Sequence, residues 1–238
     1  MANGKGVGSF AAVSSALLLA LALAFAGREV ASALRLARAS ERFVSVKGLS
    51  EREVPADLAI WPLTFTAVND QLAPLHAELE RGRSEIAQFL QRAGFDPKEF
   101  VASSPSISDL HAEPQYGQPP PARYRGSLTV TLRSPKVEKV KGLTAQTGAL
   151  VERGVVLGAA GQGAQYFFTA LNGVKPAMIA EATKNARAAA QQFAADSGSK
   201  VGAIREARQG LFTIEDRDQF TPEIKAVRVV TTVDYFLE

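Results

Sequence analysis

The sequence contains no cysteine, and this absence removes several classes of site. Without thiols the chain forms no disulfide, carries no thiolate nucleophile and offers no cysteine-ligated zinc site. A cysteine-free domain also folds equally well in a reducing or an oxidising compartment. Cysteine usage therefore does not decide where the protein is located.

Histidine is almost absent as well, since His76 and His111 are the only two in the chain. Neither belongs to an HExxH motif, and no G-x-S-x-G nucleophile elbow occurs. The glycine-rich run 158–163 precedes strand-like residues, whereas a phosphate loop opens a helix. We therefore expect no catalytic residue, no metal site and no cofactor, and predict that the protein is not an enzyme. The alternative is an enzyme whose site joins residues distant in sequence.

Excess charge of one sign is also small. The chain has 27 Lys and Arg against 24 Asp and Glu, a formal net charge of +3. No cluster of basic residues is interleaved with aromatics, so we expect no nucleic-acid partner.

Charged residues are missing altogether from Val7 to Ala26. About 20 apolar residues suffice to cross a bilayer as a helix, so this segment is predicted to be a single membrane span that contacts lipid. The alternative is a secretory signal peptide, with Ala24-Phe25-Ala26 as the cleavage site before Gly27. The residues that mark the predicted span are Val7, Phe10, Val13, Leu17, Leu18, Leu19, Leu21, Leu23, Phe25 and Ala26.

The flanking charges bear on orientation. Lys5 precedes the span, whereas Arg28, Arg35, Arg38 and Arg42 follow it. By the positive-inside rule these arginines favour a cytoplasmic location for the large domain. We expect residues 1–27 to form a cytoplasmic tail and anchor, 28–42 a helical stalk and 43–238 the folded domain.

Periodicity within 43–238 predicts an α+β fold, a mainly antiparallel sheet with about three helices packed on it. Pro62 is expected to place its strand at a sheet edge or a bulge. The ranges below are the clearest. Strands are predicted over 59–68, 126–133 and 226–237, and helices over 72–93, from Ser134-Pro135 to about 153, and over 175–197.

Two aromatic residues are candidates for a binding groove. Trp61 and Tyr166 could line a pocket for a lipid, a peptide or an envelope polymer, which would make the protein a periplasmic binding module. Such residues more often belong to the core.

Four segments together resemble the SIMPL-domain family of bacterial envelope proteins. They are the opening Phe43–Leu63, the alanine-rich Pro176–Gly202, and the closing segments 207–214 and 227–237. The resemblance covers about residues 43–238. It implies a secreted, periplasmic or membrane-anchored protein, with links to oxidative-stress tolerance and to homo-oligomers, and it supplies no catalytic residues.

These observations together predict a non-enzymatic cell-envelope protein that self-assembles. The resemblance implies export, against the arginine count, and we follow it. The expected location is the inner membrane, with a single span and the domain in the periplasm. Secretion to the periplasm after signal cleavage is the alternative. The terminal strand 226–237 is expected to pair across subunits.

Overall fold

The computed structural model describes residues 20–32, 42–112, 120–158 and 163–238. The chain divides into two compact units, each assembled from separate stretches of sequence. Unit 1 comprises residues 1–50, 177–211 and 229–238, and unit 2 comprises 51–176 and 212–228. The α+β class with antiparallel sheets is confirmed, but there are two sheets where the sequence indicated one.

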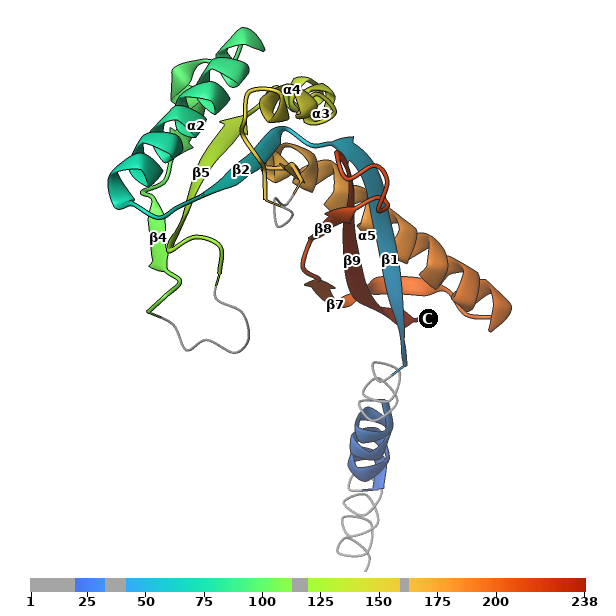
Figure 1. The fold of residues 1–238 in the computed structure, drawn as a ribbon. Helices are drawn as coiled ribbons and strands as arrows, with labels where there is room; N and C mark the ends of the chain where they lie inside the picture. The colour runs from blue at the N-terminus through green and yellow to red at the C-terminus, as the bar shows by residue number, and fades with distance from the viewer. Residues whose placement is uncertain (1–19, 33–41, 113–119, 159–162) are drawn as a thin grey trace, which may run out of the picture. The chain divides into compact units, whose positions relative to one another are not determined.

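Unit 2 contains a five-stranded sheet in the order β3-β5-β2-β6, with β4 also paired to β5. Helix α2 lies along β2 and β5 (Figure 1). The strands are β2 (Leu58–Asn69), β3 (Phe100–Ala102), β4 (Ser106–Asp109), β5 (Tyr124–Ser134) and β6 (Gln165–Phe167). The helices are α2 (Leu72–Arg92), the short η1 (Pro97–Glu99), α3 (Val137–Thr144) and α4 (Gly148–Val151).

Alternation along β2 and β5 builds the core of unit 2. Trp61, Leu63 and Phe65 on β2 are each less than 5% exposed, and they lie opposite Leu132, Val130 and Leu128 on β5. The side-chain period of two places all of them on the face that α2 covers. The predicted helix 72–93 is confirmed by α2, which contributes Leu75, Leu79, Ile86 and Leu90 to this core.

Strand β2 is not an edge strand, but at Pro62 it is paired on one side only in the described sheet, as expected for a proline at a local edge. Strand β2 lies between β5 and β6. Strand β6 pairs only with Leu58, Ala59 and Ile60, so it stops before Pro62. A missing N–H at residue 62 therefore removes no ladder bond on that side.

In unit 1, β1 (Phe43–Pro55), β9 (Ile224–Leu237) and β7 (Val201–Gln209) follow one another in the second sheet. Strand β8 (Thr213–Asp216) pairs with residues 225–228 at the beginning of β9, and both of these segments belong to unit 2. The predicted terminal strand exists, but it is a central strand with neighbours on both sides. Its free hydrogen-bonding edge, which we expected to pair across subunits, is therefore absent.

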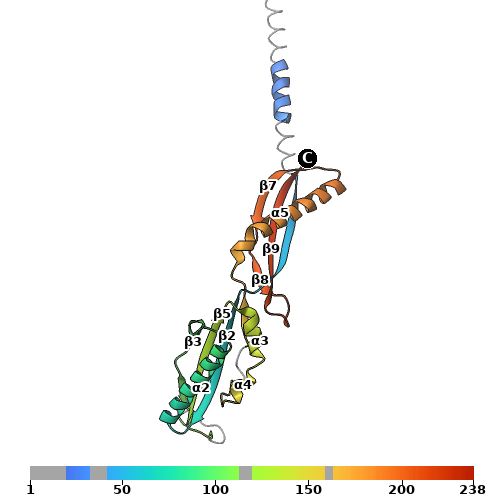
Figure 2. The ribbon, with the colours of Figure 1, turned by 90° about the horizontal axis from the view of Figure 1, so that it is seen from above.

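Helix α5 (Leu171–Asp196) packs along the sheet of unit 1 (Figure 2). Its buried stripe is strictly spaced by four residues and consists of Met178, Ala182, Ala186, Ala190 and Ala194. Helical spacing in the sequence also allows a buried face that runs through Ala189 and Phe193, but Phe193 is 60% exposed. The alanines allow a very close approach. A Cβ at Gly48 on β1 would lie 1.8 Å from the carbonyl oxygen of Ala182.

Other expectations fall partly outside the described residues. The predicted span Val7–Ala26 is described only from residue 20 onward, and residues 20–32 are helical. Residues 33–41 of the predicted stalk lie outside the described part of the chain. Among the described residues, no helix combines the length and the apolarity that crossing a membrane requires. The single helix predicted after Ser134-Pro135 is divided into α3 and α4.

Candidate functional site

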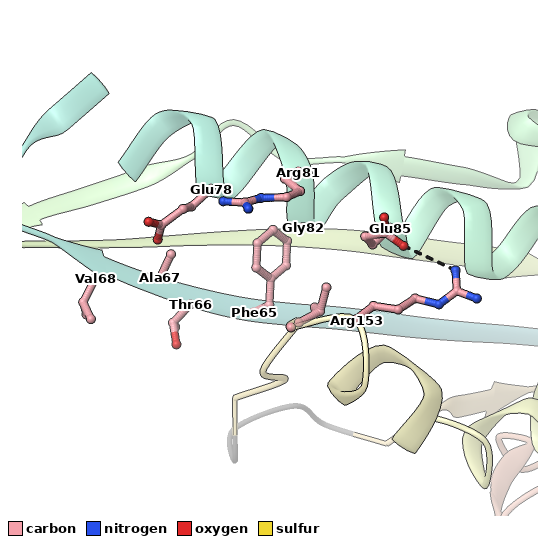
Figure 3. A pocket seen from close by; sticks show the side chains of 11 residues that line it. Phe65, Thr66, Ala67, Val68, Glu78, Arg81, Gly82, Glu85 and Arg153 are labelled. Atoms are coloured by element: carbon pink, nitrogen blue, oxygen red, sulfur yellow. Dashed lines mark hydrogen bonds and ion pairs between the residues drawn. The ribbon is translucent and has the colours of Figure 1, made fainter. Parts of the chain in front are cut away.

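A pocket of about 350 Å³ in unit 2 opens between α2, β2 and the turn that follows α4. Its lining combines an apolar floor with two acidic and two basic side chains (Figure 3). We call it the charged pocket. The floor includes Phe65 and Val155, and the charged residues are Glu78, Arg81, Glu85 and Arg153.

The floor of the charged pocket depends on one glycine. Gly82 faces Phe65 across the interface of α2 and β2, and a Cβ at Gly82 would come within 2.4 Å of the phenyl ring. The absence of a side chain lets the helix approach the sheet, and Phe65 is then only 3% exposed. The turn at residues 154–158 joins the same wall, because Gly158 donates its N–H to the carbonyl oxygen of Thr64 at 2.9 Å.

Three of the four charged side chains in this pocket have a partner. Arg153 contacts Glu85 at 3.3 Å, which ties the turn after α4 to α2. Glu78 accepts a hydrogen bond from the Asn69 amide at 3.1 Å. Arg81 has neither an ion pair nor a side-chain hydrogen bond among the described residues. The arrangement suits a small polar ligand.

A larger pocket of about 630 Å³ lies in unit 2 between β6 and the paired strands β8 and β9. We call it the aromatic pocket because three consecutive aromatic residues, Tyr166, Phe167 and Phe168, line one wall. The opposite wall includes Ile214, Pro222 and Lys225. Tyr166 was one of the two groove residues expected from the sequence, and it is 7% exposed.

Tyr166 lies near an ion pair that anchors the start of β9. The ammonium of Lys141, on α3, forms an ion pair with the carboxylate of Glu223, a residue that is only 5% exposed. Their hydrogen bond raises the pKa of the Lys141 ammonium and lowers that of the Glu223 carboxyl. Burial raises the pKa of the Tyr166 phenol, and the Glu223 carboxylate acts in the same direction. Glu223 also accepts the N–H of Ala56 through its backbone oxygen at 2.8 Å.

Trp61, the other expected groove residue, does not share a pocket wall with Tyr166. It is 4% exposed and belongs to the same hydrophobic core. Its accessible edge lines a separate pocket of about 200 Å³ with Thr64 and Leu157. The two residues are therefore brought together as core neighbours, while the aromatic pocket uses only Tyr166.

Sequence reasoning considered the aromatic run 166–168 for a groove but missed Ile214 and Lys225, which lie about 50 residues further along the chain. The only local signal was the aromatic run 166–168. His76 and His111 are both exposed. In the part of the chain that the structure describes, no three His, Asp or Glu side chains gather as metal ligands would.

Comparison with known families agrees with the architecture. A family model described as SIMPL, a protein of unknown function (DUF541), matches residues 44–231. The chain therefore belongs to the SIMPL family. No curated protein matches it.

Proposed function

We propose that the chain is a non-enzymatic, membrane-anchored protein of the cell envelope that self-assembles through its SIMPL domain and contributes to envelope or oxidative-stress tolerance. The observation that carries the assembly is the free edge of β7. This strand has nine residues, it pairs only with β9 in the described sheet, and residues 203–209 are all exposed.

The direction of the backbone groups on β7 supports this role. Gly210 donates its N–H to Val230 on β9 at 2.8 Å. Because alternate residues of a strand point their backbone groups to opposite sides, the N–H groups of Gln209 and Ala207 point away from β9. Such groups are a template for another strand. Strand β1 is the opposite edge of the same sheet, so pairing β1 of one copy with β7 of the next would build a closed ring or a filament.

The self-assembly test is light scattering coupled to size-exclusion chromatography on the full chain in detergent. We expect an oligomer for the wild type and a lower mass for Gln209→Pro, which removes an outward N–H but no bond to β9. Glu206→Gln is the matched control and retains the oligomer. A wild type that stays monomeric at micromolar concentration would refute self-assembly.

The predicted span Val7–Ala26 supports the anchor, and the family supports export. A reporter fusion tests both. Alkaline phosphatase joined after Glu238 is active only outside the cytoplasm, so we expect activity in membranes. Activity in a soluble periplasmic fraction would indicate cleavage after Ala26. An inactive phosphatase, with an active cytoplasmic reporter at the same position, would reverse the orientation.

A further inference from the structure

The aromatic pocket contains apolar surface that unit 2 does not cover. Phe167 and Ile214 on its walls are 41% and 37% exposed. The volume of about 630 Å³ is within the range of small-molecule sites. An apolar ligand that covers these side chains would remove them from water.

Lys225 places an unusual polar group in the same wall. It is 7% exposed, and its ammonium donates to Asp216 alone among the described residues. An ammonium has three N–H donors, so two of them have no acceptor in the described part of the chain. Buried hydrogen-bond donors in proteins nearly always have an acceptor. An oxygen atom of a ligand in the pocket would supply one for the Lys225 ammonium.

The charged side chains in the lining favour a ligand with a neutral hydrogen-bond acceptor over an acidic ligand. Asp216 already compensates Lys225, and Glu215 adds a further carboxylate to the lining. A second full negative charge there would be repelled, whereas a carbonyl oxygen has the lone pairs without the charge. The edges are too short for a peptide strand, since β6 has three residues and β8 has four.

We propose that the aromatic pocket binds the acyl chain of a neutral single-chain lipid ester. The chain packs between Phe168 and Ile214, and the ester carbonyl accepts a hydrogen bond from Nζ of Lys225. The site lies within unit 2 and does not depend on self-assembly through β7. Lipid binding and self-assembly are therefore independent proposals, and an experiment that refutes one leaves the other unaffected.

The test uses the full chain in membrane vesicles and a glycerol dodecanoyl monoester that carries a diazirine on its chain. After irradiation and trypsin digestion, label is expected on peptides 154–184, 209–217 and 218–225, which contain the walls of the pocket. Unlabelled monoester should compete. Lys225→Met should reduce this labelling at least tenfold, the change expected when a hydrogen bond to a charged group is lost.

Ile214→Trp fills the pocket at a partly exposed position and should abolish the same labelling, which guards against misfolding of the lysine variant. Arg81→Met in the charged pocket is the control and should label like the wild type. The predicted span Val7–Ala26 contacts lipid and is expected to be labelled in every variant. Labelling of the domain only outside the pocket peptides, or unchanged labelling in both pocket variants, would overturn the site. Stronger labelling by the corresponding free fatty acid would overturn the neutral ester.

Discussion

Replacing Gly48 with alanine should detach α5 from the sheet of unit 1. The added Cβ would lie 1.8 Å from the carbonyl oxygen of Ala182 and 2.5 Å from the backbone nitrogen of Ala186. Both are backbone atoms of a helix, so no change of rotamer relieves the overlap. Restoring an ordinary contact of about 3.4 Å requires α5 to move outward by about 1.6 Å.

Such a movement weakens every contact under the helix. A gap of about 0.5–1 Å already loses a quarter to a half of the dispersion energy of a contact. The buried stripe that includes Met178 and Ala190 would lose packing, and the bond from the Asn185 amide to the Leu49 oxygen, at 2.8 Å, would lengthen. We expect the free energy of unfolding to fall by about 3 kcal/mol or more, which is at the upper end for overpacked cores.

Hydrogen exchange read by mass spectrometry is the suitable assay, because Trp61 reports on unit 2 alone. A loss of about 3 kcal/mol corresponds to roughly a hundredfold faster exchange in α5 and β1. The control is Gly142→Ala, in α3, where a Cβ meets nothing within 4 Å. This variant should be neutral or more stable. Unchanged protection of α5 in Gly48→Ala would refute the close approach as described.

Three further predictions concern unit 2 and can be followed by Trp61 fluorescence. Gly82→Ala should cost about 1–2 kcal/mol, less than Gly48→Ala, because the 2.4 Å overlap is with the ring of Phe65, a side chain that can move. The hydrogen bonds of Glu99 to Lys136 and Ser134 lower the pKa of this carboxyl to about 2. Glu99 should therefore stabilise the fold above its ordinary pKa of 4.5, and this contribution should be lost as the pH falls toward 2. Glu99→Gln should flatten that part of the curve of stability against pH, and an unaltered acid profile would contradict the assignment. Lys141→Met leaves the buried Glu223 carboxylate without its ion-pair partner, so it should lower the stability of the fold at neutral pH, and the deficit should shrink in acid as Glu223 protonates. A deficit independent of pH would show that the lost charge pair is not its cause.

Local patterns were sufficient where one face of an element meets a single core. The alternation in 59–68 and 126–133 predicted β2 and β5, and the apolar spacing in 72–93 predicted α2, which ends before Gly94 as expected. In each case a polar side and an apolar side are distinct in the sequence, so burial has only one solution. The α+β class followed from these elements.

Patterns failed where the choice depends on a distant partner. In α5 nearly every face carries alanine, so helical spacing allowed both the observed stripe and the one through Phe193. The choice is made by Gly48 on β1, more than 120 residues away in the sequence. Its backbone lies so close to α5 that the helix residues at this contact, Ala182 and Ala186, have to be small. The same limit applies to β9. Its β-branched run predicted a strand, but only the pairing with β1 and β7 makes it central.

The position of β9 moves the predicted self-association to other strands. A central strand has its ladder bonds satisfied on both sides, so its apolar sequence serves the core of its own unit. Strand β7 shows the opposite character, with exposed side chains and two register shifts between Val201 and Glu206. Such irregularities protect an edge from indiscriminate pairing. They leave residues 206–209 as the regular stretch, so a partner strand would have to match this short segment, which favours one defined register over open-ended aggregation.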